Sequence, residues 1–147
     1  SSTETKQFMI FKLGEDEYGA PLDHITSIVT PQVITRVPKA PHYIRGVINL
    51  RGEIVPVMGL SERFNLPAVE TTDDTRIIIF KINDASIGGI VDNVVEVIQI
   101  SGSAIEKKSN FSSDTLQDLV FGVAKIEGRI IMLLDLENMI ENNGDEG

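Results

Sequence analysis

The chain has 147 residues and a formal net charge of −9, and 41% of its residues are hydrophobic. This composition is typical of a globular protein, and the acidic excess disfavours nucleic-acid binding because the phosphate backbone is also negative. The absence of cysteine excludes disulfides and thiol chemistry. Because the apolar runs are too short to span a membrane and no leader peptide is recognisable, we expect a soluble, cytoplasmic protein without membrane insertion.

The first predicted elements are two strands joined by a turn. Residues 1–6 are polar and are predicted to be a flexible tail, and the segment from Phe8 to Leu13 has the pattern of a strand. A second strand is predicted from Tyr18 to Val29. Apolar residues within it also recur at a helical spacing, so a helical turn or a bulge near Asp23 and His24 is an open alternative.

A proline-rich segment leads into a hairpin that forms the centre of the chain. Residues 31–43 contain three prolines and are predicted as loop with one short strand at Val33–Val37. From Gly46 to Leu60, two β-branched runs flank Arg51-Gly52, where glycine supplies the positive φ of a tight turn. Pro56 cannot donate to a ladder, which places the second strand at a sheet edge or at a bulge. Arg51 is expected at the hairpin tip, either free to meet a partner or simply solvated.

Short helices are predicted between the strands and at the end of the chain. Residues 61–64 fit a single helical turn, a capping-box spacing predicts another short helix at residues 104–108, and residues 114–119 fit a further turn. The last helix is expected to begin after Asp135, which can cap it, and to bury Leu136, Met139 and Ile140.

The chain contains an internal repeat. Gln7–Val29 aligns without gaps with Arg76–Ile98, and Gly46–Phe64 aligns without gaps with Gly122–Ile140. Identical pairs include Ile10 with Ile79, Phe11 with Phe80, Lys12 with Lys81, Gly19 with Gly88, Gly46 with Gly122 and Gly52 with Gly128. Two long alignments in the same order indicate a duplication of a β-rich unit.

The duplication predicts an all-β fold. We expect one domain over residues 7–141, made of two small five-stranded barrels at approximately residues 14–67 and 75–135. The first strand and the last helix complete these units, residues 68–74 link them, and residues 142–147 form a second flexible tail. Units this small have marginal cores, so they should pack on a shared core, and the groove between them is the expected binding feature.

No pattern for catalysis, metal binding or cofactor binding is recognisable. His24 and His42 lie far apart in sequence and have no ligand-spaced carboxylate or thiol, and Gly88-Gly89 lacks the context of a phosphate-binding loop. We therefore expect no enzyme activity, no metal and no cofactor. An enzyme whose residues converge only in space, and a small-molecule-sensing or other protein-interaction β-barrel module, are the alternatives.

Three motifs occur in an order that resembles the CheW-like domain family of bacterial chemotaxis. They are GVINLRGEIVPV at residues 46–57, FKLGEDEYG at residues 11–19 and GGIVDNV at residues 88–94. The resemblance covers roughly residues 7–140. It implies two SH3-like barrels and an adaptor that couples transmembrane chemoreceptors to the histidine kinase CheA. Because no kinase or receiver segment is attached, it also implies the stand-alone adaptor of the family, recruited to membrane receptor arrays and monomeric when isolated.

The resemblance also implies roles for individual residues. Arg51 corresponds to the receptor-contacting arginine of the family, and the expected receptor-binding set is Arg51, Gly46, Asn49, Ile25, Ser27 and Val97. A cytoplasmic receptor tip would dock there, and the CheW-like domain of the kinase would meet the barrel ends. Phe111, which stands in a polar loop, matches an aromatic at the kinase or ring interface, although it could instead plug the core. Val33 is assigned to the same interface.

Two positions depart from the family pattern. Ser27 stands where many members carry a glutamate near the receptor groove, and Gly59 stands where an aspartate is common after the hairpin. The first departure weakens any carboxylate role in this groove, and the second weakens the usual cap of the short helix.

Overall fold

The computed structural model describes residues 4–107 and 118–141. Within these ranges the chain is mostly strand. The strands are β1 (Thr5–Leu13), β2 (Asp16–Pro21), β3 (Ile25–Val29), β4 (Ile44–Leu50), β5 (Glu53–Gly59), β6 (Arg76–Ile82), β7 (Ala85–Val91), β8 (Asn93–Ser101), β9 (Ile105–Lys107), β10 (Val120–Ile126) and β11 (Arg129–Leu134). The helices are short: α1 (Leu60–Arg63), α3 (Leu136–Glu141) and 3-10 turns at Leu22–His24 and Gly102–Ala104.

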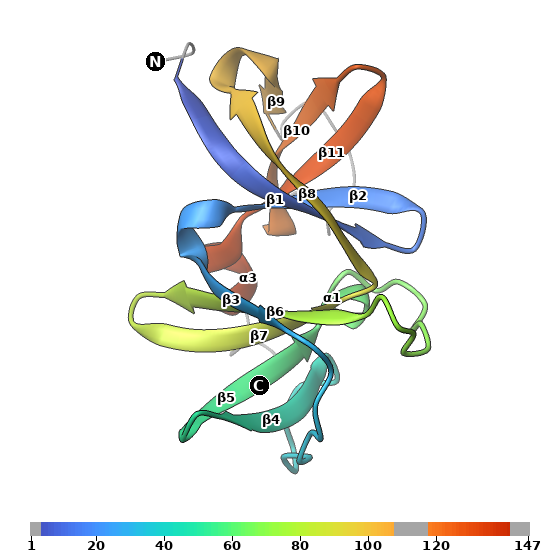
Figure 1. Ribbon diagram of the computed structural model, residues 1–147, viewed down its shortest axis with the longest axis vertical. Helices are drawn as coiled ribbons and strands as arrows, with labels where there is room; N and C mark the ends of the chain where they lie inside the picture. The colour runs from blue at the N-terminus through green and yellow to red at the C-terminus, as the bar shows by residue number, and fades with distance from the viewer. Residues whose placement is uncertain (1–3, 108–117, 142–147) are drawn as a thin grey trace.

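The strands form two sheets stacked along the long axis of the molecule (Figure 1). One sheet has six strands in the order β8-β1-β2-β11-β10-β9, and the other has five in the order β3-β6-β7-β5-β4. The predicted all-β class with short connecting helices and a C-terminal helix is confirmed. The predicted count of five strands per unit is matched by one sheet, and β9 is the additional strand of the other.

The two sheets exchange strands between the sequence repeats. The β1–β2 hairpin joins β8, β10 and β11 of the second repeat, while its counterpart β6–β7 joins β3, β4 and β5 of the first. The pairing registers are equivalent: Gly19 lies opposite Leu133 in one sheet, and Gly88 lies opposite Val57 in the other. The predicted boundaries 14–67 and 75–135 therefore do not coincide with the sheets, because each repeat gives its first hairpin to the other.

This exchange produces three hydrophobic clusters. One lies in the six-stranded sheet around Phe8 and Ile131, and another lies in the five-stranded sheet around Ile48 and Ile77. The largest cluster joins both sheets to α3 and includes Phe11, Tyr18, Met58, Leu60, Phe64, Phe80, Leu136 and Met139. The shared core thus occupies the space between the sheets, where α3 also lies (Figure 1).

The last helix begins where the sequence predicts. The side chain of Asp135 accepts a hydrogen bond from the backbone N–H of Asn138 at 3.0 Å, and Leu136 and Met139 are buried. At its other end, the Arg63 guanidinium donates to the Met139 carbonyl at 2.9 Å and lies over the Tyr43 ring, 4.6 Å from its centroid. Arg63 thus ties α3 to the five-stranded half of the molecule.

Several local predictions need correction. The open alternative near Asp23 and His24 is resolved as a 3-10 turn that separates β2 from β3. The helix predicted at residues 104–108 is wrong over residues 104–107, which are the described part of that range. The Ser101 side chain accepts a hydrogen bond from Ser103 N and caps a 3-10 turn at Gly102–Ala104, and Ile105–Lys107 then pairs with β10 as a strand. In place of a strand at Val33–Val37 there is one isolated bridge, from Thr35 to Val47.

Pro56 is predicted at a sheet edge or at a bulge, and the register shift beside it lies in the partner strand β4, between Ile44 and Gly46. The sheet edge is wrong, because β5 lies between β7 and β4. Pro56 is tolerated there for two reasons. Val47, opposite Pro56, exchanges its backbone hydrogen bonds with Thr35 at 2.8 and 2.9 Å, so this pair requires no N–H from Pro56. On the other side, the pairing of β5 with β7 begins only at Val57.

Candidate protein-docking face

The tip of the β4–β5 hairpin holds Arg51 outside the core. Arg51 and Gly52 have φ angles of 55° and 87°, which is the left-handed geometry of a two-residue hairpin turn. The Asn49 side-chain oxygen accepts a hydrogen bond from Gly52 N at 2.9 Å and fixes the turn. Among the described residues, the guanidinium of Arg51 has no hydrogen-bond or ion-pair partner, so it is available to a partner molecule.

Gly46 occupies a different environment from Arg51. It is buried in β4 at a register shift, has a φ of 146°, and a Cβ added there would lie 2.1 Å from the Thr35 carbonyl oxygen. Glycine is therefore needed at this position for close backbone packing. Its membership of the receptor surface stays a prediction, because it presents no side chain to a partner.

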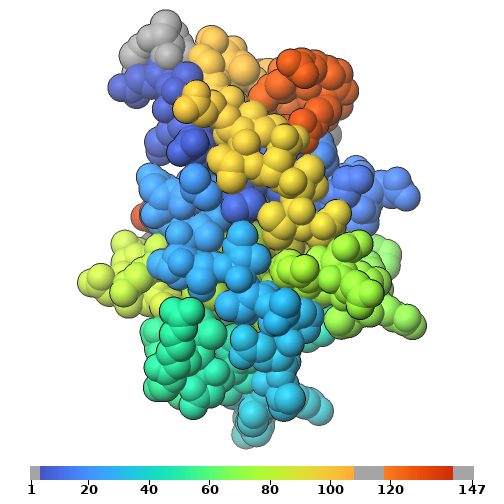
Figure 2. Space-filling view, in the orientation of Figure 1, coloured from blue at the N-terminus to red at the C-terminus, as the bar shows by residue number. Residues whose placement is uncertain are grey.

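The other predicted receptor contacts lie on two edge strands. Ile25 and Ser27 are half-buried on β3, the edge of the five-stranded sheet, and Val97 is 42% exposed on β8, the edge of the six-stranded sheet. Both strands, light blue and yellow in Figure 2, lie on the face turned to the reader. An open hollow of about 480 Å³ is lined by Leu22 and Asp23 of the 3-10 turn before β3, by residues 5–7 of β1 and by Gln99 of β8.

The structure thus groups some of the predicted residues and separates others. Ile25 and Ser27 lie on one strand, β3, which shares a face with β8 in Figure 2, whereas the β4–β5 turn that carries Arg51 lies in the lower part of Figure 1. Val33 is 90% exposed in the segment between β3 and β4. Phe111 lies outside the described residues.

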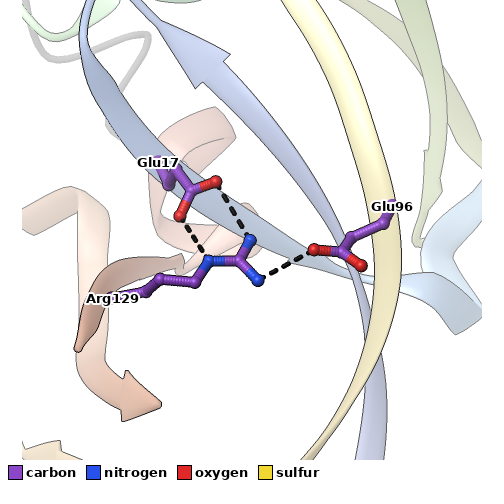
Figure 3. A network of polar contacts seen from close by, with 3 residues as sticks. All are labelled: Glu17, Glu96 and Arg129. Atoms are coloured by element: carbon purple, nitrogen blue, oxygen red, sulfur yellow. Dashed lines mark hydrogen bonds and ion pairs between the residues drawn. The ribbon is translucent and has the colours of Figure 1, made fainter. Parts of the chain in front are cut away.

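Sequence reasoning missed a charged network on the six-stranded sheet (Figure 3). Arg129, at the start of β11, donates through two nitrogens to the Glu17 carboxylate of β2 at 2.9 and 3.0 Å, and through a third to Glu96 of β8 at 2.8 Å. β11 and β2 are paired directly, but β1 and β2 lie between β11 and β8, so the bond from Arg129 to Glu96 joins two strands that no ladder pairs. The repeat alignment offered one signal for this network. Ser86, Ser27 and Glu53 stand at the positions equivalent to Glu17, Glu96 and Arg129, so the three charges differ from their counterparts in the other repeat.

The network shifts the pKa values of Glu17 and Arg129. The Arg129 hydrogen bond lowers the pKa of Glu17 against an opposing effect of burial, and the Arg129 pKa is raised by both carboxylates. Burial also raises the pKa of the neighbouring Tyr18 to about 12. Within the described ranges, no group of three histidine, aspartate or glutamate side chains is placed to hold a metal ion.

Replacing Glu17 with glutamine is expected to lower the free energy of unfolding at pH 7 by about 1–2 kcal/mol, because a charge-assisted bond at a partly exposed site is lost. A carboxylate with a lowered folded-state pKa contributes fully above its unfolded pKa of about 4.3, and the contribution disappears as pH falls through the folded value. Urea unfolding at pH 7 and pH 3 should therefore show wild type and variant converging at low pH.

The matched control for Glu17 is Glu106→Gln, which removes the exposed pair between Glu106 and Lys125. This change should cost less than about 0.5 kcal/mol at either pH. Equal losses from both variants would mean that the Arg129 network is an ordinary surface pair.

No helix in the described part of the chain has the length and apolar character needed to cross a membrane.

Known proteins are similar to this chain in sequence and in fold. The model of the CheW-like domain family matches residues 7–143. Chemotaxis protein CheW of Helicobacter pylori is 34% identical over 140 residues, covering 95% of this chain and 84% of that protein. Chemotaxis protein CheW of Bacillus subtilis is 34% identical over 141 residues, covering 96% of this chain and 90% of that protein.

A solved structure agrees with these relatives. The crystal structure of the scaffolding protein TtCheW from Thermoanaerobacter tengcongensis superposes with a TM-score of 0.88 at 36% identity, covering 98% of each chain. The sequence matches and the superposition over nearly the whole chain agree, and the chain belongs to the CheW-like domain family.

Proposed function

We propose that this chain is a non-enzymatic adaptor that couples transmembrane chemoreceptors to the histidine kinase CheA on the cytoplasmic side of the membrane. The observation that carries the proposal is the similarity over nearly the whole chain, in sequence and in fold, to chemotaxis CheW proteins, one of which is described as a scaffolding protein. The docking features of the surface support a role in binding other proteins. The isolated chain is expected to be a monomer.

Two contact regions follow from this function. The receptor tip meets the edge strands at Ile25, Ser27 and Val97 and reaches the turn of Arg51, with Gly46 and Asn49 shaping that hairpin. The CheW-like domain of the kinase meets the region that contains Val33, together with Phe111. Arg51 is exposed and Val33 is 90% exposed, which makes both accessible to large partners.

The test is reconstitution with a receptor cytoplasmic fragment and CheA. We expect the chain to retain each partner separately in a pull-down, to bring both into one complex, and to make kinase activity depend on the receptor. The chain alone should turn over no ATP. Failure to retain either partner would contradict the proposal. If a small metabolite instead raised the melting temperature of the chain, the sensor module would be favoured.

A further inference from the structure

The edge strand β8 is interrupted near its middle. In its pairing with β1, Ile10 lies opposite Glu96 and Phe11 lies opposite Val94, so Val95 has no partner and forms a bulge. A bulge disrupts the local ladder and bends its strand. β8 is also the outer strand of its sheet, so no second ladder compensates for the interruption.

The Arg129 network contacts β8 next to this bulge. Glu96, the residue that follows Val95, accepts from the Arg129 guanidinium at 2.8 Å. The guanidinium is itself held by two bonds to Glu17, whose side chain is only 17% exposed. A planar guanidinium can make these bonds together in a fixed geometry, which one ammonium group cannot reproduce. Arg129 therefore anchors β8 to β2 and β11 where the backbone ladder is weakest.

The equivalent strand of the other sheet has the same bulge without the charged network. In β3, Ile25 lies opposite Phe80 and Ser27 lies opposite Ile79, so Thr26 is the unpaired residue. The Thr26 hydroxyl donates to the Ile79 carbonyl at 3.3 Å, which secures this bulge. Val95, at the position equivalent to Thr26, has no hydroxyl. The same bulge is thus held by the Thr26 hydroxyl in β3 and by the bond from Arg129 to Glu96 in β8.

The residues beside Glu96 are apolar and accessible. Val95 is 39% exposed and Val97 is 42% exposed, and the strand that carries them, β8, lies on the face shown in Figure 2. We propose that Arg129 is a positioning residue, which holds β8 at its bulge so that Val95 and Val97 present an apolar contact to the receptor tip. This inference rests on the proposed function, which supplies the partner, while the hold of Arg129 on β8 can be tested without one.

The test compares Arg129→Gln with wild type by amide hydrogen exchange and by affinity for a receptor cytoplasmic fragment. We expect the amides of residues 94–98 to exchange about tenfold faster, while those of β6 and β7 stay within about twofold. Receptor affinity should fall by about three- to tenfold, and affinity for the isolated CheW-like domain of the kinase should stay unchanged. Arg129→Lys should recover only part of the loss.

Two further variants separate positioning from general stability. Lys125→Gln removes an exposed ion pair on the same sheet and should change neither exchange nor affinity. Adding Val95→Thr to Arg129→Gln gives β8 the hydroxyl that β3 has, and should restore part of the protection of β8 in hydrogen exchange.

The outcomes are distinct. Unchanged exchange in β8, faster exchange throughout the chain, or an equal loss of both affinities would overturn the positioning role. Failure of wild type to bind the receptor fragment would instead overturn the proposed function, while exchange in β8 would still decide whether Arg129 holds the strand.

Discussion

Replacing Arg51 with alanine is expected to weaken binding of a receptor cytoplasmic fragment by about ten- to a hundredfold. A charge-assisted hydrogen bond contributes on the order of 1.5–3 kcal/mol, which corresponds to this loss of affinity. The tip of the β4–β5 hairpin exposes Arg51, and the turn is held by the bond from Gly52 N to Asn49 rather than by the guanidinium. Thermal stability and binding to the kinase domain should therefore stay near wild type.

The chain supplies a matched control for this change. Glu127 occupies the equivalent turn position between β10 and β11, with a φ of 50° against 55° for Arg51. Glu127→Ala carries the same backbone cost at a positive φ and should leave receptor binding unchanged. Arg51→Lys keeps the charge but loses the planar fork, so it should recover only part of the affinity if the contact is bidentate.

Two measurements on Arg51→Ala, Arg51→Lys and Glu127→Ala test this prediction: receptor affinity by calorimetric titration and the melting temperature by thermal unfolding. Normal receptor binding by Arg51→Ala would show that this arginine is a solvated turn residue. Unfolding of Arg51→Ala but not of Glu127→Ala would show a structural role for Arg51.

The fold could be predicted because its signals are local or repeated. The turn at Arg51-Gly52 and the cap at Asp135 depend on neighbouring residues, and the ungapped repeat predicted two similar β units. The exchange of hairpins between the sheets could not be predicted, because both arrangements bury the same apolar residues. The choice between them depends on which strand pairs with β2, and the parallel pairing of β2 with β11 joins segments distant in the chain.

Only those residues of the candidate site that are marked by their own sequence neighbours could be predicted. Arg51 stands out as the one charge within an apolar motif, and its position at a turn follows from the adjacent glycine. Glu17, Glu96 and Arg129 are ordinary charged residues in their own segments, and only the sheet brings them together. Gly46 was assigned to the receptor surface by resemblance, and its buried position against Thr35 follows from a contact that no motif encodes.

Replacing Gly46 with alanine is expected to destabilise the fold by roughly 2–5 kcal/mol, which combines strain at an unfavourable φ with overpacking. The added Cβ would lie 2.1 Å from the Thr35 carbonyl oxygen and 2.7 Å from its carbonyl carbon. Both atoms belong to the backbone carbonyl group of Thr35, whose oxygen accepts a hydrogen bond from Val47 N, so relief requires the segment between β3 and β4 to move. The melting temperature should fall by roughly 5–20 °C.

Gly52→Ala is the matched control, because Gly52 also has a positive φ, at 87°, but has no atom within 4 Å of an added Cβ. It should cost only about 1 kcal/mol, the backbone part of the penalty. The difference between the two variants, measured by urea unfolding, isolates the contact with Thr35. Because this contact positions the segment that carries Val33, Gly46→Ala should weaken kinase binding as well as receptor binding, whereas Arg51→Ala should affect the receptor alone. A stable Gly46→Ala protein that loses only receptor affinity would instead place Gly46 in direct contact with the receptor.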